Sequence, residues 1–261
     1  MFNLNTYGRL LDTQRLGAEL SLLDETESTN TYIASRLDWA GVEKMVVLAE
    51  RQTAGRGRFG RVWSSFPGVN LAFSLAWPVP SGFDSPNVVT LAAGVALSEA
   101  VGELVEVSSE LKYPNDLMLE GKKAAGVLTE LKKSNGGSFA VIGVGVNVNT
   151  DAAQFPDEIK GHATSLKLAA GENVPREAVL ALFLNNLERS LDLLEKGDTA
   201  SVLNRYKSVS NALGKEIIVT VNGNEEAKGV AVDIDAEGGL VLEVAPGEHH
   251  TVKTGETRFV Y

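Results

Sequence analysis

The segment from Arg51 to Trp63, RQTAGRGRFGRVW, combines four arginines with three glycines and is the strongest chemical signal in the chain. Glycines let backbone N–H groups approach an anion closely, and guanidinium groups match the oxygens of a phosphate or a carboxylate. The GxxxxGK[ST] pattern of P-loops does not occur in it. The spacing therefore predicts an anion-binding loop of another kind, against the alternative of a solvated basic loop.

A second segment, Lys112 to Asp116 (KYPND), lies between two strand-like runs. Its proline and its Asn-Asp pair favour a turn, which on its own is a plain hairpin connection. The residues that follow, Gly121 to Gly126 (GKKAAG), add lysines beside a glycine that permits close approach of a ligand. The combination favours a turn that takes part in ligand binding.

Two further segments carry weaker signals. The run Gly143 to Asn149 (GVGVNVN) interrupts a predicted strand with glycines, which often marks a close ligand contact. Its asparagines offer a nucleobase both a donor and an acceptor. The run Ser28-Thr29-Asn30 is explained completely by the start of a helix. Neither segment decides a function by itself.

The elements that must position these segments are a mixture of strands and helices. The spacing of apolar residues predicts a helix that starts at Ser28 and helices over 8–20, 87–101 and 175–194. It predicts strands over 20–26, 45–50, 70–77, 105–112, 117–119, 126–131 and 139–148. From Gly214 onward short strands alternate with turns, including an Asn222-Gly223 hairpin turn. We therefore expect a mixed domain followed by a small all-β module, a barrel.

The composition excludes several classes of function. The 261 residues are 44% apolar, include no cysteine and carry a formal net charge of −10. Without cysteine there are no disulfides, thiolate metal sites or cysteine nucleophiles. The negative charge opposes nonspecific binding to nucleic acid or anionic lipid. The sequence has neither a basic leader nor an apolar run of about 18 residues, so we expect a cytoplasmic protein outside the membrane.

Four motifs, taken in their order along the chain, resemble the catalytic domain of biotin protein ligases, the biotin–[acetyl-CoA-carboxylase] ligase family. They are the GRGRxGRxW run, the K-[aromatic]-PND turn, the K-x-x-G step and the G-x-G-x-N run. The resemblance extends over most of residues 20–261, and Tyr113 stands where the family commonly carries tryptophan. It implies an α+β fold. A class II aminoacyl-tRNA synthetase-like mixed sheet flanked by helices would form residues 1–213, and a small C-terminal Src-homology-3-like β-barrel would form residues 214–261.

The same resemblance implies an ATP-dependent ligase. Members of the family use ATP and Mg²⁺ to activate biotin to biotinyl-5′-AMP, and then transfer biotin to a lysine of a biotin carboxyl carrier domain. Too few residues precede Ser28 for the winged-helix domain of the family's repressors, so we expect a monofunctional ligase that binds no nucleic acid. Monomer and homodimer both stay open, as do the acceptor carboxylase and the order of substrate binding.

The resemblance also implies roles for individual residues. The expected catalytic residues are Lys123, which stabilises charge in the transition state, with Arg58 and Arg56 at the carboxyl and α-phosphate groups. The expected biotin-binding residues are Ser28, Thr29, Asn30, Gln52, Gly55, Arg56, Gly57, Arg58, Lys123 and Gly126. The expected ATP-binding residues are Arg58, Arg61, Trp63, Lys112, Asn115, Asp116 and Asn147. Asp116 would also contact Mg²⁺ with the nucleotide, and it is a candidate base for the transfer step.

Two alternatives stay open from the sequence. One is a lipoate–protein ligase of the same superfamily, which would lack the arginine-rich loop in this form. The other is a DNA-binding regulator that senses a small ligand, which the acidic charge opposes. For the loop itself we expect mobility until a ligand arrives, because clustered arginines repel one another without an anion between them.

Overall fold

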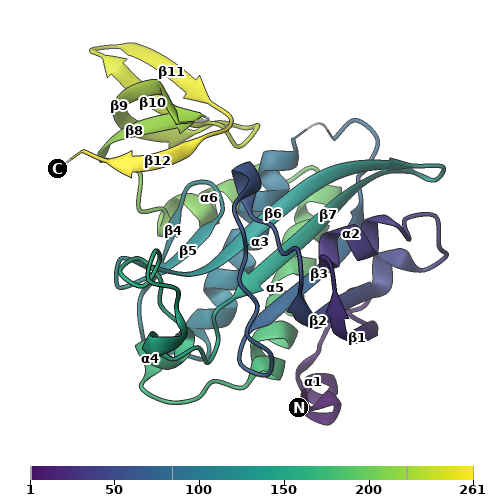
Figure 1. The fold of residues 1–261 in the computed structure, drawn as a ribbon. Helices are drawn as coiled ribbons and strands as arrows, with labels where there is room; N and C mark the ends of the chain where they lie inside the picture. The colour runs from purple at the N-terminus through teal and green to yellow at the C-terminus, as the bar shows by residue number, and fades with distance from the viewer. Residues whose placement is uncertain (1, 84, 222, 261) are drawn as a thin grey trace.

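Figure 1 shows the computed structural model of the chain, which describes residues 2–83, 85–221 and 223–260. Two β-sheets organise it: a large sheet with helices packed along it, and a small sheet beyond one end of the large one. Of the expected Asn222-Gly223 turn, Asn222 lies outside the described residues. Within the described ranges, no helix has the length and apolar character needed to cross a membrane.

The large sheet has seven strands in the order β1-β2-β3-β7-β6-β5-β4. β1 and β2 run parallel and the other neighbouring pairs run antiparallel, so the sheet is mixed, as expected. Its strands are β1 (Glu19–Thr26), β2 (Met45–Gln52), β3 (Leu71–Pro78), β4 (Ser109–Lys112), β5 (Asp116–Leu119), β6 (Lys122–Ser134) and β7 (Gly137–Val146).

Helices pack on one face of this sheet and form the main core with it. α3 lies against β4, β6 and β7 and also contacts α5 and α6, which explains why its Ala, Val and Leu residues are buried on nearly every side. The α-helices are α1 (Leu4–Leu10), α2 (Thr29–Ala34), α3 (Pro86–Gly102), α4 (Leu166–Ala170), α5 (Arg176–Glu195) and α6 (Thr199–Val209). Short 3₁₀ helices are η1 (Val42–Lys44), η2 (Arg58–Gly60) and η3 (Ala152–Gln154).

The opposite face of the large sheet is covered only in part. A smaller apolar cluster packs α2 and the residues after it against β2, β3 and β7, with Ile33, Val47 and Val141 fully buried. The part of this face that β6 and β7 form next to the β4–β5 turn borders a cavity instead. The two faces of the sheet therefore have separate roles, one in folding and one in lining the cavity.

The small sheet, called the C-terminal sheet below, consists of five antiparallel strands in the order β11-β10-β9-β8-β12. Its strands are β8 (Glu216–Val221), β9 (Asn224–Ile234), β10 (Leu240–Ala245), β11 (Glu248–Val252) and β12 (Glu256–Phe259). The last strand returns beside the first, which is the strand order expected of a small barrel. The described residues form no ladder between β11 and β12, so these two strands are edges.

The expected helix over residues 8–20 is wrong. The helix is α1, which ends at Leu10, and the chain then follows an irregular path to β1. Backbone N–H groups of Gln14, Arg15 and Leu16 donate to the Glu188 carboxylate of α5, so a helix is not needed to satisfy them. Burial of Leu16 and anchoring by a distant carboxylate override the local helical pattern.

Smaller differences from expectation occur at element ends. The strand expected over 105–112 begins only at Ser109, and helix α6 was not expected at all. Pro175 is the N-cap residue of α5 rather than a residue of its first turn. The other expected strands and the helices at 87–101 and 175–194 are confirmed within a few residues.

Candidate active site

A cavity of about 1170 Å³ lies on the open face of the large sheet, and the C-terminal sheet contributes to its wall. The strand register places Gly126 opposite Gly145 and Leu128 opposite Gly143. Because side chains alternate between the two faces of a strand, Gly126, Gly143 and Gly145 share the face that borders the cavity. These three, the floor glycines, leave neighbouring positions of the cavity floor without side chains.

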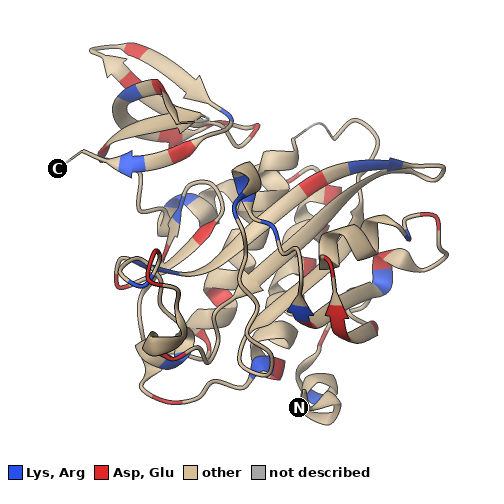
Figure 2. Ribbon diagram, in the orientation of Figure 1, with Lys and Arg blue, Asp and Glu red and all other residues tan. Residues whose placement is uncertain are grey.

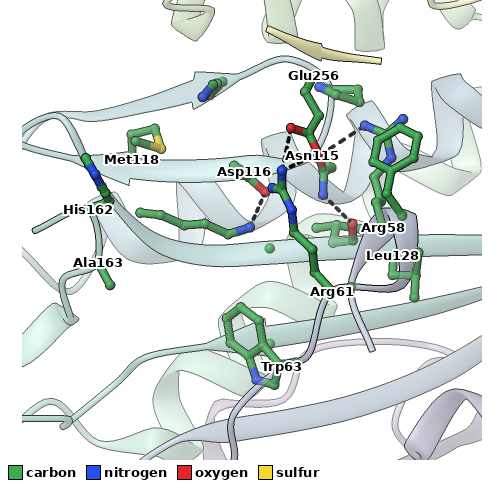
Figure 3. A pocket seen from close by; sticks show the side chains of 18 of the residues that line it. Arg58, Arg61, Trp63, Asn115, Asp116, Met118, Leu128, His162, Ala163 and Glu256 are labelled. Atoms are coloured by element: carbon green, nitrogen blue, oxygen red, sulfur yellow. Dashed lines mark hydrogen bonds and ion pairs between the residues drawn. The ribbon is translucent and has the colours of Figure 1, made fainter. Parts of the chain in front are cut away.

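Two of the floor glycines make room for predicted ligand-binding side chains. A Cβ atom on Gly143 would overlap Asn30 Oδ1, and a Cβ atom on Gly145 would overlap the indole ring of Trp63. Figure 3 shows Trp63 against the strands at the floor. The glycines of the GVGV run are thus explained by the side chains that rest on them.

Polar side chains gather at the α2 end of the cavity, formed by Ser28, Thr29, Asn30 and Gln52. The backbone N–H and the hydroxyl of Thr29 donate to Gln52 Oε1 at 2.8 and 3.1 Å. Ser28 is the N-cap residue of α2, but its side chain makes no capping hydrogen bond and borders the cavity. The run that a helix start explained from sequence therefore also supplies donors and acceptors to the cavity.

Lys123 lies at the other end of the cavity and is held from several sides. Its Nζ atom is 2.6 Å from Asp116 Oδ1, an ion pair (Figure 3). Its backbone N–H donates to His162 O at 2.8 Å, and its carbonyl accepts from Thr164 N at 2.9 Å. The third floor glycine, Gly126, allows the approach, since a Cβ atom there would lie 3.2 Å from Nζ. The ammonium group is consequently fixed at this lysine end of the cavity.

Two arginines of the loop reach the C-terminal sheet. Arg58 Nη1 donates to Gly255 O at 3.1 Å and Arg58 Nη2 donates to Thr254 Oγ1 at 3.2 Å. Arg61 forms an ion pair with Glu256, drawn in Figure 3. Burial lowers the pKa of Arg58 from its ordinary value, although nearby Tyr113 and carboxylates oppose this effect. A desolvated guanidinium group is a strong binding site for an oxyanion.

The other two arginines have separate partners. Arg51 pairs with Glu25 of β1 at 2.8 Å, and Arg56 Nη2 donates to Thr31 Oγ1 of α2 at 3.2 Å. Figure 2 shows the basic positions of the loop among acidic positions of neighbouring elements. Neighbouring oxygens thus compensate part of the charge of the four arginines, but Arg58 and Arg61 still repel each other. The mobility of the loop without a ligand stays a prediction.

The KYPND turn is attached to both β6 and the arginine loop. Asn115 Nδ2 donates to Val127 O at 3.0 Å, and Arg58 Nη1 donates to Asn115 Oδ1 at 3.4 Å. Lys112 also borders the cavity. Burial lowers its pKa, while the charge of Asp116 partly restores it. The lysine end thus collects several cations in a partly desolvated space, which favours a polyanionic ligand.

Trp63 and Asn147 border the cavity in different ways. Trp63 Nε1 is buried and has no partner among the described residues, so it is a donor left for a ligand. The Asn147 amide is already engaged, because it accepts from Asn70 Nδ2 at 3.3 Å and donates to Thr164 O at 3.1 Å. Asn147 therefore anchors the segment before α4 to β7.

All but one of the predicted site residues border this cavity. The exception is Gly55, which packs against Gln52 and Trp63 without lining the cavity. Its carbonyl accepts a hydrogen bond from Trp63 N at 2.9 Å. Among the cavity-lining residues that sequence reasoning missed are Phe59, Met118, His162 and Glu256. Phe59 lies within the recognised loop, but the other three gave no local signal, because only folding brings them to the cavity.

The cavity offers few protein ligands for a Mg²⁺ ion. Within the described ranges, no group of three or more His, Cys, Asp or Glu residues is placed to hold a metal ion. Asp116 is a carboxylate at the lysine end, and it is paired with Lys123. This set fits a Mg²⁺ ion carried by nucleotide phosphates with most of its water shell, rather than one in an all-protein cage.

Comparisons with known proteins identify the family of the chain. The model of the "Biotin/lipoate A/B protein ligase family" matches residues 22–147, and that of the "Biotin protein ligase C terminal domain" matches residues 212–257. The "Bifunctional ligase/repressor BirA" of Bacillus subtilis is 35% identical over 91% of this chain and 73% of its own length. The "Biotin--[acetyl-CoA-carboxylase] ligase" of Mycobacterium tuberculosis is 33% identical over 95% of this chain and 93% of its own length.

A solved structure shows the same fold. The biotin protein ligase from Aquifex aeolicus in complex with biotin and ATP superposes with a TM-score of 0.80 and 30% identity, covering 92% of this chain and 98% of that chain. The mixed sheet with its helices therefore has a counterpart in a protein whose structure contains biotin and ATP. With about a third of its residues identical to those of relatives that it matches over most of their length, this chain belongs to the biotin protein ligase family.

Proposed function

We propose that this chain activates biotin with ATP to biotinyl-5′-AMP and then transfers the biotinyl group to a lysine of a biotin carboxyl carrier domain. The observation that carries the proposal is the division of one cavity into two chemically different ends. The α2 end offers neutral donors and acceptors suited to a ureido ring, and the lysine end offers cations suited to phosphates. Biotin and ATP need these two environments side by side.

In the first step a carboxylate oxygen of biotin attacks the α-phosphorus of ATP, and the bond to pyrophosphate breaks. The attacking carboxylate is ionised at neutral pH, so the step needs no general base. Lys123 is our candidate for stabilising the negative charge that builds at this centre, and Asp116 orients it at 2.6 Å. Arg56 and Arg58 would hold the carboxyl and phosphate oxygens.

The nucleotide would occupy the lysine end. We assign Lys112, Asn115 and Arg61 to the phosphates and ribose, and Trp63, with its unpartnered Nε1, to the adenine. Asn147 was assigned to the adenine from the resemblance. With its amide engaged by Asn70 and Thr164, it would act by holding the wall against which the adenine rests. Mg²⁺ bound through ATP would neutralise the departing pyrophosphate, with Asp116 as its nearest candidate ligand.

In the second step the amine of an acceptor lysine attacks the acyl carbon, AMP leaves, and the amine gives up a proton. A free lysine amine has a pKa near 10.4, so a base must accept this proton at neutral pH. Asp116 is our candidate, because its carboxylate borders the cavity where the adenylate would lie.

The proposal also covers partners and organisation. The acceptor would be a carrier domain that presents its lysine at the mouth of the cavity. We divide the chain into a catalytic domain, residues 1–213, and a C-terminal domain, residues 214–261. The match of a C-terminal domain model to residues 212–257 supports this division. We also place the reaction in the cytoplasm.

A labelling experiment tests the function. The purified chain is incubated with ATP, Mg²⁺ and an apo carrier domain, with either biotin or lipoate, and the mass of the carrier is measured. We expect addition of one biotinyl group that depends on ATP and on the acceptor lysine, and no addition of lipoate. Labelling with lipoate alone would replace our proposal by the lipoate–protein ligase alternative.

A further inference from the structure

Two polar side chains lie behind the α2 end of the cavity without lining it. Ser74 of β3 is fully buried in the sheet, and Glu130 of β6 is partly buried beside it. Both contact Asn30 of α2, which is 5% exposed. Neither carries a motif that points to a function, and the reaction described above does not use them.

The contacts around Asn30 are short and come from three strands. Ser74 Oγ donates to Asn30 Oδ1 at 2.6 Å. Asn30 Nδ2 donates to Glu130 Oε2 at 2.9 Å and to Leu128 O at 3.4 Å. The amide rests over Gly143, where any side chain would collide with it. The Asn30 side chain is thus held by hydrogen bonds to β3 and β6 and packs against β7.

These hydrogen bonds fix which end of the amide is available to a ligand. Both Nδ2 hydrogens of Asn30 are spent on protein acceptors, whereas Oδ1 accepts from Ser74 and keeps a second lone pair. The reverse orientation would turn the Asn30 oxygen toward a carboxylate, which only accepts when ionised. Burial raises the pKa of Glu130, but hydrogen bonds from Asn30 and Lys132 outweigh it and the pKa is lowered. Glu130 is therefore ionised at neutral pH.

The neighbouring side chain has the opposite polarity. Gln52 Oε1 accepts from both the backbone N–H and the hydroxyl of Thr29, so its oxygen is engaged. Its Nε2 group has no hydrogen-bond acceptor in the part of the chain that the structure describes. The Ser74 hydroxyl lies between the two halves, 2.6 Å from Asn30 Oδ1 and 2.7 Å from Thr29 Oγ1, and its one hydrogen goes to Asn30. The α2 end thus presents an acceptor at Asn30 and a donor at Gln52.

We infer that Ser74 and Glu130 are positioning residues that lock the Asn30 amide with its oxygen toward the ligand, so that the site selects a head group carrying an N–H donor beside a carbonyl acceptor. A cyclic urea has this pattern, whereas a dithiolane ring has neither group. The inference rests on the proposed function, because it takes biotin as the ligand. It adds two residues outside the cavity that determine head-group specificity.

The test uses the full chain and measures binding and steady-state kinetics for wild type, Ser74→Ala, Glu130→Ala and Glu130→Gln. Without its donor or acceptor partner, the Asn30 amide rotates, and we expect the Kd and KM for biotin to rise about tenfold in both alanine variants. In Ser74→Ala the KM for ATP and the kcat at saturating biotin stay near wild type. In Glu130→Ala the kcat also falls, because Glu130 is an ion-pair partner of Arg56 at 3.9 Å. Glu130→Gln keeps an acceptor oxygen and recovers part of the loss.

Thr129→Val is the matched control. Thr129 lies next to Glu130 on β6, and its buried hydroxyl has no partner among the described residues, so its loss should leave the biotin KM unchanged. Equal biotin affinity in wild type and in folded Ser74→Ala and Glu130→Ala would overturn the inference. If wild type itself does not bind biotin, the proposed function fails instead.

A second measurement needs no variant and covers the case in which the alanine variants do not fold. Biotin methylated at one or the other ureido nitrogen is titrated into the wild-type chain by calorimetry. The isomer that loses the N–H facing Asn30 should bind at least about tenfold more weakly than biotin, because a buried acceptor is left unpaired. Wild-type affinity for both isomers would contradict the selection of an N–H donor.

Discussion

Lys123 and Arg58 both border the cavity, but different neighbours hold them. Lys123 meets one carboxylate, Asp116, at 2.6 Å and leaves its remaining N–H bonds to a ligand. Arg58 donates to two oxygens of the C-terminal sheet as well as to Asn115. Removing Lys123 should therefore affect the binding and the reaction of the ligand, whereas removing Arg58 should also loosen the enclosure of the cavity.

For Lys123→Ala we expect biotin-dependent release of pyrophosphate to fall at least about 100-fold, the loss typical of removing one preorganised donor. The fold should persist, because β6 keeps its backbone pairs. Lys122→Ala is the control, since Lys122 is exposed and does not line the cavity. Unchanged release in Lys123→Ala, measured by a coupled pyrophosphate assay, would show that the catalytic lysine has been misplaced.

For Arg58→Gly we expect the adenylate to form but to escape from the cavity, because the loop loses its contacts with Gly255 and Thr254. Free biotinyl-5′-AMP acylates lysines without selection, so added bystander proteins should become biotinylated. Arg51→Ala, which removes an exposed arginine paired with Glu25, serves as the control. Mass spectrometry of the bystanders checks this, and a variant that labels only its carrier domain would count against a closing role for Arg58.

At the scale of elements, the arginine loop has free backbone donors. Gly57 N and Trp63 N are bonded across the loop, to Arg61 O at 2.7 Å and Gly55 O at 2.9 Å. Between them, the backbone N–H groups of Arg58, Phe59 and Val62 have no acceptor in the described part of the chain. Phe59 and Gly60 both have positive φ angles, of 55° and 73°. Successive N–H groups in such a turn form a concave site for an anion.

We therefore expect amide hydrogen exchange over residues 55–60 to slow when biotin and ATP are added, because the ligand's oxygens accept these N–H groups. The control segment is 139–145 in the interior of β7, where exchange should be slow in both states. Hydrogen exchange followed by mass spectrometry gives both rates. Equal exchange of the loop with and without ligands would mean that it is already ordered by its own contacts.

At the scale of the whole molecule, Tyr113 joins the KYPND turn to the C-terminal sheet. It is 2% exposed, and its hydroxyl lies 3.0 Å from Gly238 O and 3.2 Å from Val252 O. Thr257 of β12 donates back to Tyr113 O at 3.2 Å. Burial raises the pKa of Tyr113 to about 12, so its O–H remains a donor at physiological pH. The C-terminal sheet is thus attached directly to the lysine end of the cavity.

For Tyr113→Phe we expect the free energy of unfolding to fall by about 1–3 kcal/mol, the cost of leaving buried carbonyls unpaired. The KM for ATP should rise more than the KM for biotin, because the turn at the lysine end loses its support. Tyr206→Phe is a matched control, since Tyr206 is fully buried and its hydroxyl has no partner among the described residues. Denaturant unfolding and steady-state kinetics check both variants, and equal stability of the two would contradict the attachment.

Local patterns determined most of the elements and most of the site. Apolar periodicity predicted the strands and long helices because burial of one face imposes it on the sequence itself. The arginine loop, the KYPND turn and the floor glycines were recognisable from the sequence. Each of them combines its characteristic residue types within a few consecutive positions. Local sequence motifs therefore predicted the residue types of these segments.

Only the tertiary structure decided which distant groups meet. Glu188 accepts hydrogen bonds from backbone N–H groups of the irregular segment after α1. Ser74 and Glu130 orient Asn30, and Glu256 pairs with Arg61. None of these pairings follows a period or a motif, because a hydrogen bond between segments far apart in sequence depends on sheet order and register. The sequence by itself determined which residue types the cavity offers to a ligand, and the packing of β3, β6, β7 and the C-terminal sheet decided how these side chains are held.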